Sequence, residues 1–288
     1  PNIPGEDGAT PMHFAARYRP LNVLKQLRST QSTTDITAEE ASQENAEPTG
    51  NLLTVETPDT VDSAEDSSES ILNCLLQKSS SNVNSQDNYG STPLHYAASK
   101  GNPRSVEELL KYGKADVTAR DKQKATPLHE ACTQGNPNVA KLLIGAGADL
   151  QARDDEKMTP LHYAAMSERV DCVKVVVDAA EDGGGMSLVE RIIAEVDREG
   201  QTALHIAVDA SAKKTAQYLL FKGAEVNAVR MNMATPLHLA ATAGDIETVE
   251  MLLNFKANVE AKNINHETPL HKAALFNNVP VIDLLLDR

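Results

Sequence analysis

The sequence predicts an all-α solenoid of stacked helix-turn-helix units that are joined by short β-hairpin loops. A motif, Thr-Pro-Leu-His or a close variant, occurs seven times in 288 residues, and four of the six steps between copies are 33 or 34 residues long. Aromatic residues make up only 3% of the chain while hydrophobic residues make up 41%, so the core must be packed mainly from small and aliphatic side chains. A regular repeat of this length is typical of units that stack along one axis. The copies begin at Thr10, Thr92, Thr126, Thr159, Thr202, Thr235 and Thr268.

Within a unit, the motif predicts the start of a short helix. In the copy at Thr235, the threonine hydroxyl can cap the helix, and Pro236 suits the first helical position, where no amide hydrogen is needed. Leu237, Ala240 and Ala241 then lie on one face of that helix. Because the two alanines are small, a neighbouring helix can approach this face closely.

A second helix is predicted after a glycine in the same unit. Gly244 is placed to end the first helix, since glycine tolerates a left-handed backbone. Val249, Leu252 and Leu253 form the apolar stripe of the helix that follows. One such helix pair is too small to bury its own apolar face, so neighbouring units must stack to make a continuous core.

The Thr-Pro-Leu-His-x-Ala core and its 33-residue period resemble the ankyrin repeat family over residues 1–28 and 82–288. The resemblance implies that each motif histidine hydrogen-bonds locally and to the neighbouring unit. We therefore expect these histidines to be buried or half-buried and to hold neither a metal nor a catalytic role. They are His13, His95, His129, His162, His205, His238 and His271.

Two of the steps are longer than the repeat, and they set the expected domain boundaries. We assign 1–28 to one repeat, 29–56 to a disordered acidic insertion, 57–91 to a degenerate repeat, and 92–288 to six repeats with a ten-residue insertion near 179–196. In the first repeat, Val23, Leu24 and Leu27 are expected on the second helix. In the degenerate repeat, residues 71–76 are expected to form a second helix.

The stretch 29–70 is strongly acidic. It contains eleven Asp or Glu and no Lys or Arg, so removing it from the net charge of −14 leaves −3 for the rest of the chain. A segment of this composition cannot bury enough apolar surface to order itself. It is either a tolerated surface loop or a regulatory segment, in which Thr57 and Ser63 are candidate phosphorylation sites.

Several function classes are disfavoured by composition. No apolar run approaches the roughly 18 residues of a membrane-spanning helix, and the start of the chain has none of the regions of a signal peptide. The three cysteines, Cys74, Cys132 and Cys172, fit reduced thiols in a cytoplasmic protein better than a disulfide framework. The negative charge argues against nucleic-acid binding. We expect no catalytic residues, no metal and no cofactor.

The candidate binding site is the concave groove that the family resemblance implies, made of hairpin tips and first helices. Aromatic residues and methionine on the outward face of the first helices are typical interface anchors, and charged residues flank or replace the glycine of the hairpin turns. The candidates for partner binding are Tyr96, Lys122, Lys124, Glu130, Glu156, Lys157, Tyr163 and Met166. Leu239, Lys272 and Phe276 are also expected to point outward, and Tyr96 and Tyr163 are expected to project away from the packing face.

The sequence therefore predicts a non-catalytic scaffold for protein partners, and its ends suggest part of a longer array. The segments 87–97 and 121–124 are similar to ankyrin-type transient receptor potential channels. This second resemblance implies an alternative: a cytosolic region that regulates gating at the plasma membrane, with oligomerisation only in that setting. A third alternative is the regulatory arm of an enzyme whose catalytic domain lies elsewhere. The full-length reading frame distinguishes the three.

Overall fold

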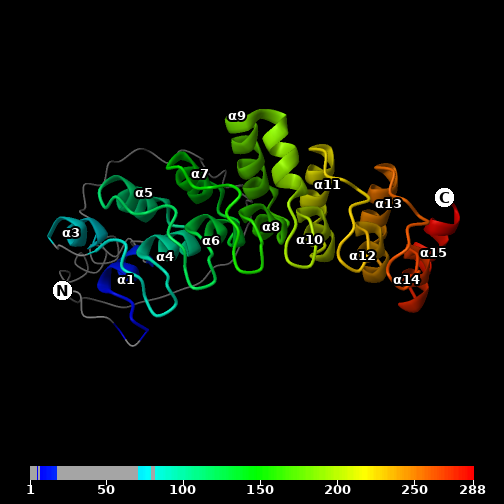
Figure 1. Cartoon of the computed structure of the whole chain (residues 1–288), viewed down its shortest axis with the longest axis horizontal. Helices are drawn as coiled ribbons and strands as arrows, with labels where there is room; N and C mark the ends of the chain where they lie inside the picture. The colour runs from blue at the N-terminus through cyan, green and yellow to red at the C-terminus, as the bar shows by residue number, and fades with distance from the viewer. Residues whose placement is uncertain (1–4, 6, 18–70, 79–81) are drawn as a thin grey trace, which may run out of the picture. The chain divides into compact units, whose positions relative to one another are not determined.

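The computed structural model of the chain describes residue 5 and residues 7–17, 71–78 and 82–288. In these residues the chain is built from helices that alternate between two layers, without a β-strand. In Figure 1 the second helices run along the top and the hairpin loops along the bottom. The first helices are α1 (Pro11–Arg17), α4 (Pro93–Lys100), α6 (Pro127–Thr133), α8 (Pro160–Ala165), α10 (Ala203–Asp209), α12 (Pro236–Ala243) and α14 (Pro269–Leu275). The second helices are α3 (Ile71–Lys78), α5 (Pro103–Lys111), α7 (Pro137–Gly145), α9 (Val170–Ala194), α11 (Lys213–Phe221), α13 (Ile246–Asn254) and α15 (Val279–Leu286).

The motif fixes the start of each first helix. Thr235 is the N-cap of α12 in an extended conformation, and Pro236 follows at the first helical position. The backbone amide of Thr235 donates to Nδ1 of His238 over 3.1 Å, and the threonine hydroxyl lies 2.9 Å from the same nitrogen. Because the same contacts recur in all seven motifs, the threonine and histidine together hold the chain where it enters the helix.

The other ring nitrogen of the histidine joins one unit to the next. His238 Nε2 lies 3.0 Å from the carbonyl oxygen of Glu267, the residue just before the next motif threonine. Equivalent contacts of 2.9–3.3 Å join six successive pairs of units. Nε2 faces a carbonyl and Nδ1 faces an amide, so Nε2 carries the hydrogen and the ring is neutral. These six histidines are at most 2% exposed, and burial lowers the pKa of each.

The seventh histidine departs from the expectation of burial. His271 keeps its contacts to Thr268, but its side chain is exposed, and among the described residues no neighbouring unit packs over it. The burial of the motif histidine therefore comes from the neighbouring unit and not from its own helix.

Replacing His238 with alanine is expected to lower the free energy of unfolding by roughly 1–3 kcal/mol, because the Thr235 amide and the Glu267 carbonyl lose their buried partner. The matched control is His271→Ala, which removes only the contacts within one unit and should cost less than about half as much. Urea unfolding followed by circular dichroism measures both. Equal losses for the two variants would contradict a role for Nε2 in joining units.

The core is a continuous row of small and aliphatic side chains. Leu237, Ala240 and Ala241 of α12 are buried, as are Val249 and Leu252 of α13, which confirms the predicted helix faces. Gly244 ends α12 in the left-handed conformation with φ 75°, as predicted. The units that begin at Thr92, Thr126, Thr159 and Thr202 repeat this arrangement, so stability is shared among unit interiors and the interfaces between them.

The unit that begins at Thr10 contacts the unit that begins at Thr92. His13 Nε2 bonds to the carbonyl of Ser91, and the amide of Asn88 donates to the carbonyl of Asp7. The unit at Thr10 therefore stacks directly on the unit at Thr92, with α1 against α4 and with α3 packed against α1 and α5. Helix α3 thus lies beside the first unit among the described residues, and the assignment of 57–91 to a degenerate repeat stays a prediction. The candidate helix residues Val23, Leu24 and Leu27 lie outside the described residues, as does the insertion 29–56.

The long step of 43 residues is accounted for by α9. Gly185 has φ 64° and ψ −165°, which interrupts the helix, and Figure 1 shows α9 as two limbs. Val189, Ile192 and Ile193 of the second limb are buried. The residues near 179–196 thus extend the second helix of one unit and return the chain to the stack as a further helical segment.

Candidate functional site

The hairpins before α4, α6, α8, α10 and α14 are each closed by a side chain. Asp121 Oδ1 accepts hydrogen bonds from the amides of Gln123 and Ala125, both over 2.9 Å. Asp87 and Asp197 bind their own turns in the same way. A side-chain oxygen that replaces backbone pairing gives a tight, well-defined turn. The positions of the hairpin tips are therefore fixed by the fold.

The last residue of each turn has a left-handed backbone. Gly90 and Gly200 occupy this position with φ 79° and 78°, whereas Lys124, Lys157 and Met233 hold φ between 60° and 62°. A side chain in this region costs roughly 1 kcal/mol relative to glycine. Lysine in place of glycine at Lys124 and Lys157 therefore puts a charged side chain at the hairpin tip and lowers the stability of the fold.

Met233→Gly is expected to raise the free energy of unfolding by up to about 1 kcal/mol, because glycine relieves the left-handed strain. The reverse change, Gly200→Met, is the matched control and should destabilise, since a Cβ there lies 3.0 Å from the amide nitrogen of Met231. Midpoints of urea unfolding measure both effects. A loss of stability in Met233→Gly would show that the Met233 side chain contributes more by packing than it costs in strain.

Successive hairpins are linked to one another through their backbones. The Lys122 amide donates to the Tyr89 carbonyl over 2.9 Å, and the Asp155 amide donates to the Gln123 carbonyl over 2.8 Å. The next link joins Arg198 to Glu156 over 2.8 Å. The tips of the units at Thr92, Thr126, Thr159 and Thr202 therefore form one continuous strip.

The charged candidates of the hairpin turns lie on this strip and are exposed, whereas Glu130 lies on α6 and is half-buried. Lys124 pairs with Asp155 over 2.7 Å, and Glu156 pairs with Arg198 over 3.0 Å. Each pair joins adjacent hairpins at the surface, where ion pairs contribute little to stability. The candidates Lys122 and Lys157 are also exposed at the tips.

The two candidate tyrosines are half-buried beside the strip. The Tyr96 hydroxyl donates to Asp87 Oδ2 over 2.7 Å, and the Tyr163 hydroxyl donates to Asp154 Oδ2 over 2.7 Å. The edges of their rings contact the motif histidine of the preceding unit, with centroids 5.3 Å and 5.5 Å apart. Burial, together with the carboxylate partner, raises the pKa of Tyr96 to about 12 and raises that of Tyr163.

These contacts correct the expectation that both tyrosines project away from the packing face. They link the hairpin to the first helix as well as presenting ring surface. Leu239 was also expected to point outward, but it is only 8% exposed. Met166 and Phe276 are each 53% exposed, and Lys272 is half-buried and paired with Glu267.

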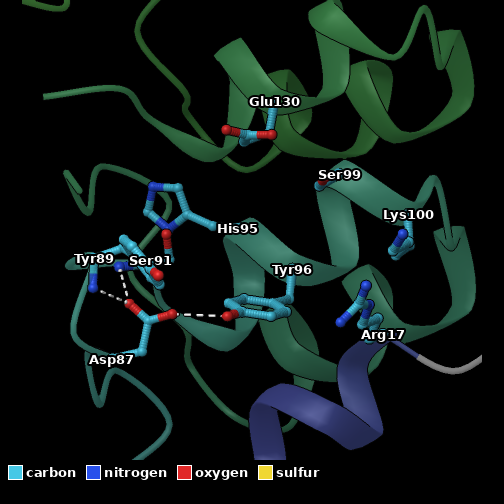
Figure 2. Close-up of a pocket in the computed structure, with 9 residues that line it drawn as sticks. All are labelled: Arg17, Asp87, Tyr89, Ser91, His95, Tyr96, Ser99, Lys100 and Glu130. Carbon is cyan, nitrogen blue, oxygen red and sulfur yellow. Dashed lines mark hydrogen bonds between the residues drawn. The ribbon is translucent and has the colours of Figure 1, made fainter. Parts of the chain in front are cut away.

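A pocket of about 320 Å³ brings two of the candidates together, as Figure 2 shows. Tyr96 and Glu130 lie on neighbouring first helices, and Arg17 from the end of α1 lies near the Tyr96 ring. Burial, then the charge of Asp121, raises the pKa of Glu130, and a hydrogen bond from Ser99 partly offsets this. The full lining consists of Arg17, Asp87, Tyr89, Ser91, His95, Tyr96, Ser99, Lys100 and Glu130.

The cationic side of this pocket was missed from the sequence. Arg17 and Lys100 are exposed, and neither forms an ion pair within the described part of the chain. Lys100 stands four residues after Tyr96, and Arg17 stands three residues after Phe14, which is 46% exposed. Helical spacing of three or four places such residues on the same side of a helix, so a search at these spacings from the outward positions could have found both.

The two candidate phosphorylation sites, Thr57 and Ser63, lie outside the described residues. Across the part of the chain that is described, no group of three or more His, Cys, Asp or Glu side chains could hold a metal ion. No helix in that same part is both long and apolar enough to cross a membrane.

Comparison with known protein families agrees with the helical units and their spacing. A family model of ankyrin repeats in three copies matches residues 62–154 and 147–230. A second model, of ankyrin repeats in many copies, matches residues 237–286. No curated protein matches the chain. Since the matched segments cover well over half of its length, the chain belongs to the ankyrin repeat family.

Proposed function

We propose that the chain is a non-catalytic scaffold that binds partner proteins on one face. This binding face consists of the hairpin tips and first helices of the units that begin at Thr92, Thr126 and Thr159. The observation that carries the proposal is the pocket on this face, where Arg17 lies beside the ring of Tyr96 and where Lys100 and the carboxylate of Glu130 also form part of the lining. Ankyrin repeats are generally protein-interaction modules, and a cytoplasmic location belongs to the same proposal.

The chemistry of the face supports a protein partner. Tyrosine and arginine are the residue types that most often carry binding energy at interfaces, because each combines a large contact area with a polar group. Arg17 and Lys100 have no ion-pair partner among the described residues, so a bound carboxylate need not displace one. The fixed hairpin tips limit the conformational entropy that a partner's binding would cost.

The strip of tips extends the same surface over several units. Lys122 and Lys157 alternate along it with the paired residues Lys124 and Glu156. A surface of mixed charge around aromatic anchors selects partners by complementarity and steers their approach. We infer that the pocket supplies affinity and that the strip supplies selectivity.

An alternative is that the chain is the cytosolic region of a cation channel. It rests on the similarity of residues 87–97 and 121–124 to ankyrin-type transient receptor potential channels. The reading frame of the whole protein tests it. Six apolar spans beyond this segment support the channel, and their absence contradicts it.

The proposed face is tested by reversing charge on it. Lys122→Glu with Lys157→Glu changes two exposed lysines at the tips, and it is expected to weaken binding of a partner captured by the full chain by about tenfold or more. The matched control is Lys141→Glu with Lys214→Glu, which changes two exposed lysines on the second helices α7 and α11. Titration calorimetry of the three proteins decides the matter. A larger loss in the control pair would contradict the proposed face.

A further inference from the structure

Two cysteines meet inside the core at the boundary between the units that begin at Thr126 and Thr159. Cys132 lies in α6 and Cys172 lies in α9, forty residues apart in sequence. Their Sγ atoms are 3.7 Å apart, and both residues are 0% exposed. Neither takes part in the binding face described above.

The repeat register brings these two positions together. Cys132 stands three residues after a motif histidine, and Cys172 stands ten residues after the next one. At the other five boundaries between units, the first position holds Ala16, Ala98, Ala165, Val208 or Ala241, and the second holds Ser105, Val139, Thr215, Thr248 or Val281. All of these residues are buried. The Thr215 hydroxyl donates to the Ser167 carbonyl of the preceding unit, so the second position faces the end of the previous first helix.

We propose that Cys132 and Cys172 form a redox-modifiable site, in which a two-electron oxidant such as a peroxide converts them into a disulfide that joins the two units. Two small aliphatic or hydroxyl side chains satisfy this contact at the other boundaries, so a cysteine on each side is not required by packing. The sulfur atoms need to close from 3.7 Å to about 2.0 Å, the length of a disulfide bond.

The reaction needs the two thiols and one molecule of peroxide, and no other reagent. One sulfur attacks a peroxide oxygen, the O–O bond breaks, and the leaving hydroxide takes the thiol proton to give water and a sulfenic acid. The second sulfur attacks the first, the S–O bond breaks, and the released hydroxide takes the second thiol proton as a second water. Two thiols are oxidised by two electrons, and one peroxide is reduced to two waters.

Burial sets the rate of this reaction. The hydrogen bond between the two thiols, together with burial, raises the pKa of Cys132, and the same hydrogen bond lowers the pKa of Cys172. Both side chains are fully buried, so a peroxide in the solvent cannot contact either sulfur while the stack is closed. Peroxide therefore reaches the pair only when the boundary opens, and oxidation reports on local unfolding between these two units. Once formed, the disulfide closes the chain between residues 132 and 172 and restricts further opening there.

The test uses the full chain in a Cys74→Ser background, because Cys74 is only partly buried and can form bonds between molecules. The protein is treated with hydrogen peroxide in sub-denaturing urea, and free thiols are then alkylated after full denaturation. Intact mass and peptide mapping are expected to show loss of two hydrogens, no alkylated thiol, and one cross-linked peptide pair that contains residues 132 and 172. Oxidation should be slower without urea, and the apparent melting temperature should rise by about 4–8 °C.

The matched control is Cys132→Ala with Cys172→Val, which installs residues that other units use at the same positions. It retains all seven methionines, so it corrects for their oxidation, and its melting temperature should not rise with peroxide. Recovery of both alkylated thiols after treatment would overturn the proposal. Conversion to sulfinic acids without a cross-link would overturn it equally, because it would show that the sulfurs cannot reach each other.

Discussion

Lowering the pH from 7.5 to 5.5 is expected to reduce the free energy of unfolding by several kcal/mol, through the histidines that join the units. Burial lowers the pKa of six motif histidines in the folded chain, to about 4 for His205. In the unfolded chain each titrates near 6.5. Below that pH the unfolded state binds more protons than the folded state, so stability falls as the pH falls. The loss begins near pH 6.5 and continues down to the folded pKa values.

The slope is set by how many histidines stay neutral in the folded chain. Each contributes up to about 1.4 kcal/mol per pH unit. Protonation would place a hydrogen on Nδ1, which already faces the amide of the motif threonine, so the folded structure has no place for it. The raised pKa of Glu130 acts in the opposite direction, but it is a single group. Most carboxylates titrate below pH 5, and the window from 6.5 to 5.5 therefore isolates the histidines.

Urea unfolding at pH 7.5, 6.5 and 5.5 measures this dependence. His205→Gln is the control: it should be less stable at pH 7.5, but its stability should fall less steeply with pH because one titrating group is gone. Stability that stays constant from pH 7.5 to 5.5 would contradict the neutral, buried state of these rings.

Replacing Tyr96 and Tyr163 together with alanine is expected to weaken partner binding by at least ~2 kcal/mol, the scale of interface hot spots. The same change should also lower the free energy of unfolding by roughly 1–3 kcal/mol, because two hydrogen bonds to carboxylates and two ring contacts with histidines are lost. Calorimetric titration of a captured partner measures the first effect, and urea unfolding measures the second.

The two effects are separated by a gentler change. Tyr96→Phe with Tyr163→Phe removes the hydroxyls and keeps the rings, so it should cost stability while most of the binding is retained. If the phenylalanine and alanine pairs weaken binding equally, the rings are not the anchors, and the carboxylates that the hydroxyls hold become the better candidates.

Most of the fold could be predicted from the sequence, because each unit repeats the same local signals. The Thr-Pro start, the glycine end of α12 and the apolar faces of α12 and α13 all follow from neighbouring residues in one unit. The stacking of the unit at Thr10 on the unit at Thr92 could not be read in this way. The second helix predicted near residues 23–27 lies outside the described residues, and the contacts of α1 with α3 and α4 join residues on the two sides of a long insertion.

The positions of the candidate residues on hairpin tips and first helices could be predicted from the repeat, but the contacts that these residues make could not. The charged hairpin tips and the tyrosines follow from their repeat positions. The bonds from Tyr96 and Tyr163 to Asp87 and Asp154 join a hairpin to the helix that follows it, and helical periodicity alone does not report such contacts. Leu239 was misassigned because the same position on the first helix differs in burial from unit to unit. It is half-buried at Tyr96 and Tyr163 but buried at Leu239.

The central claim is that partners bind the hairpin tips and first helices, and the lysines of the chain provide a direct test. Lys100, Lys122 and Lys157 lie on the proposed face, while Lys111, Lys141 and Lys214 lie on the second helices; all six are exposed. Crosslinking with an amine-reactive reagent, followed by mass spectrometry of the full chain with a captured partner, compares the two sets in one experiment. We predict crosslinks to the partner from the first three listed lysines. Crosslinks confined to the lysines of the second helices would contradict the proposed face.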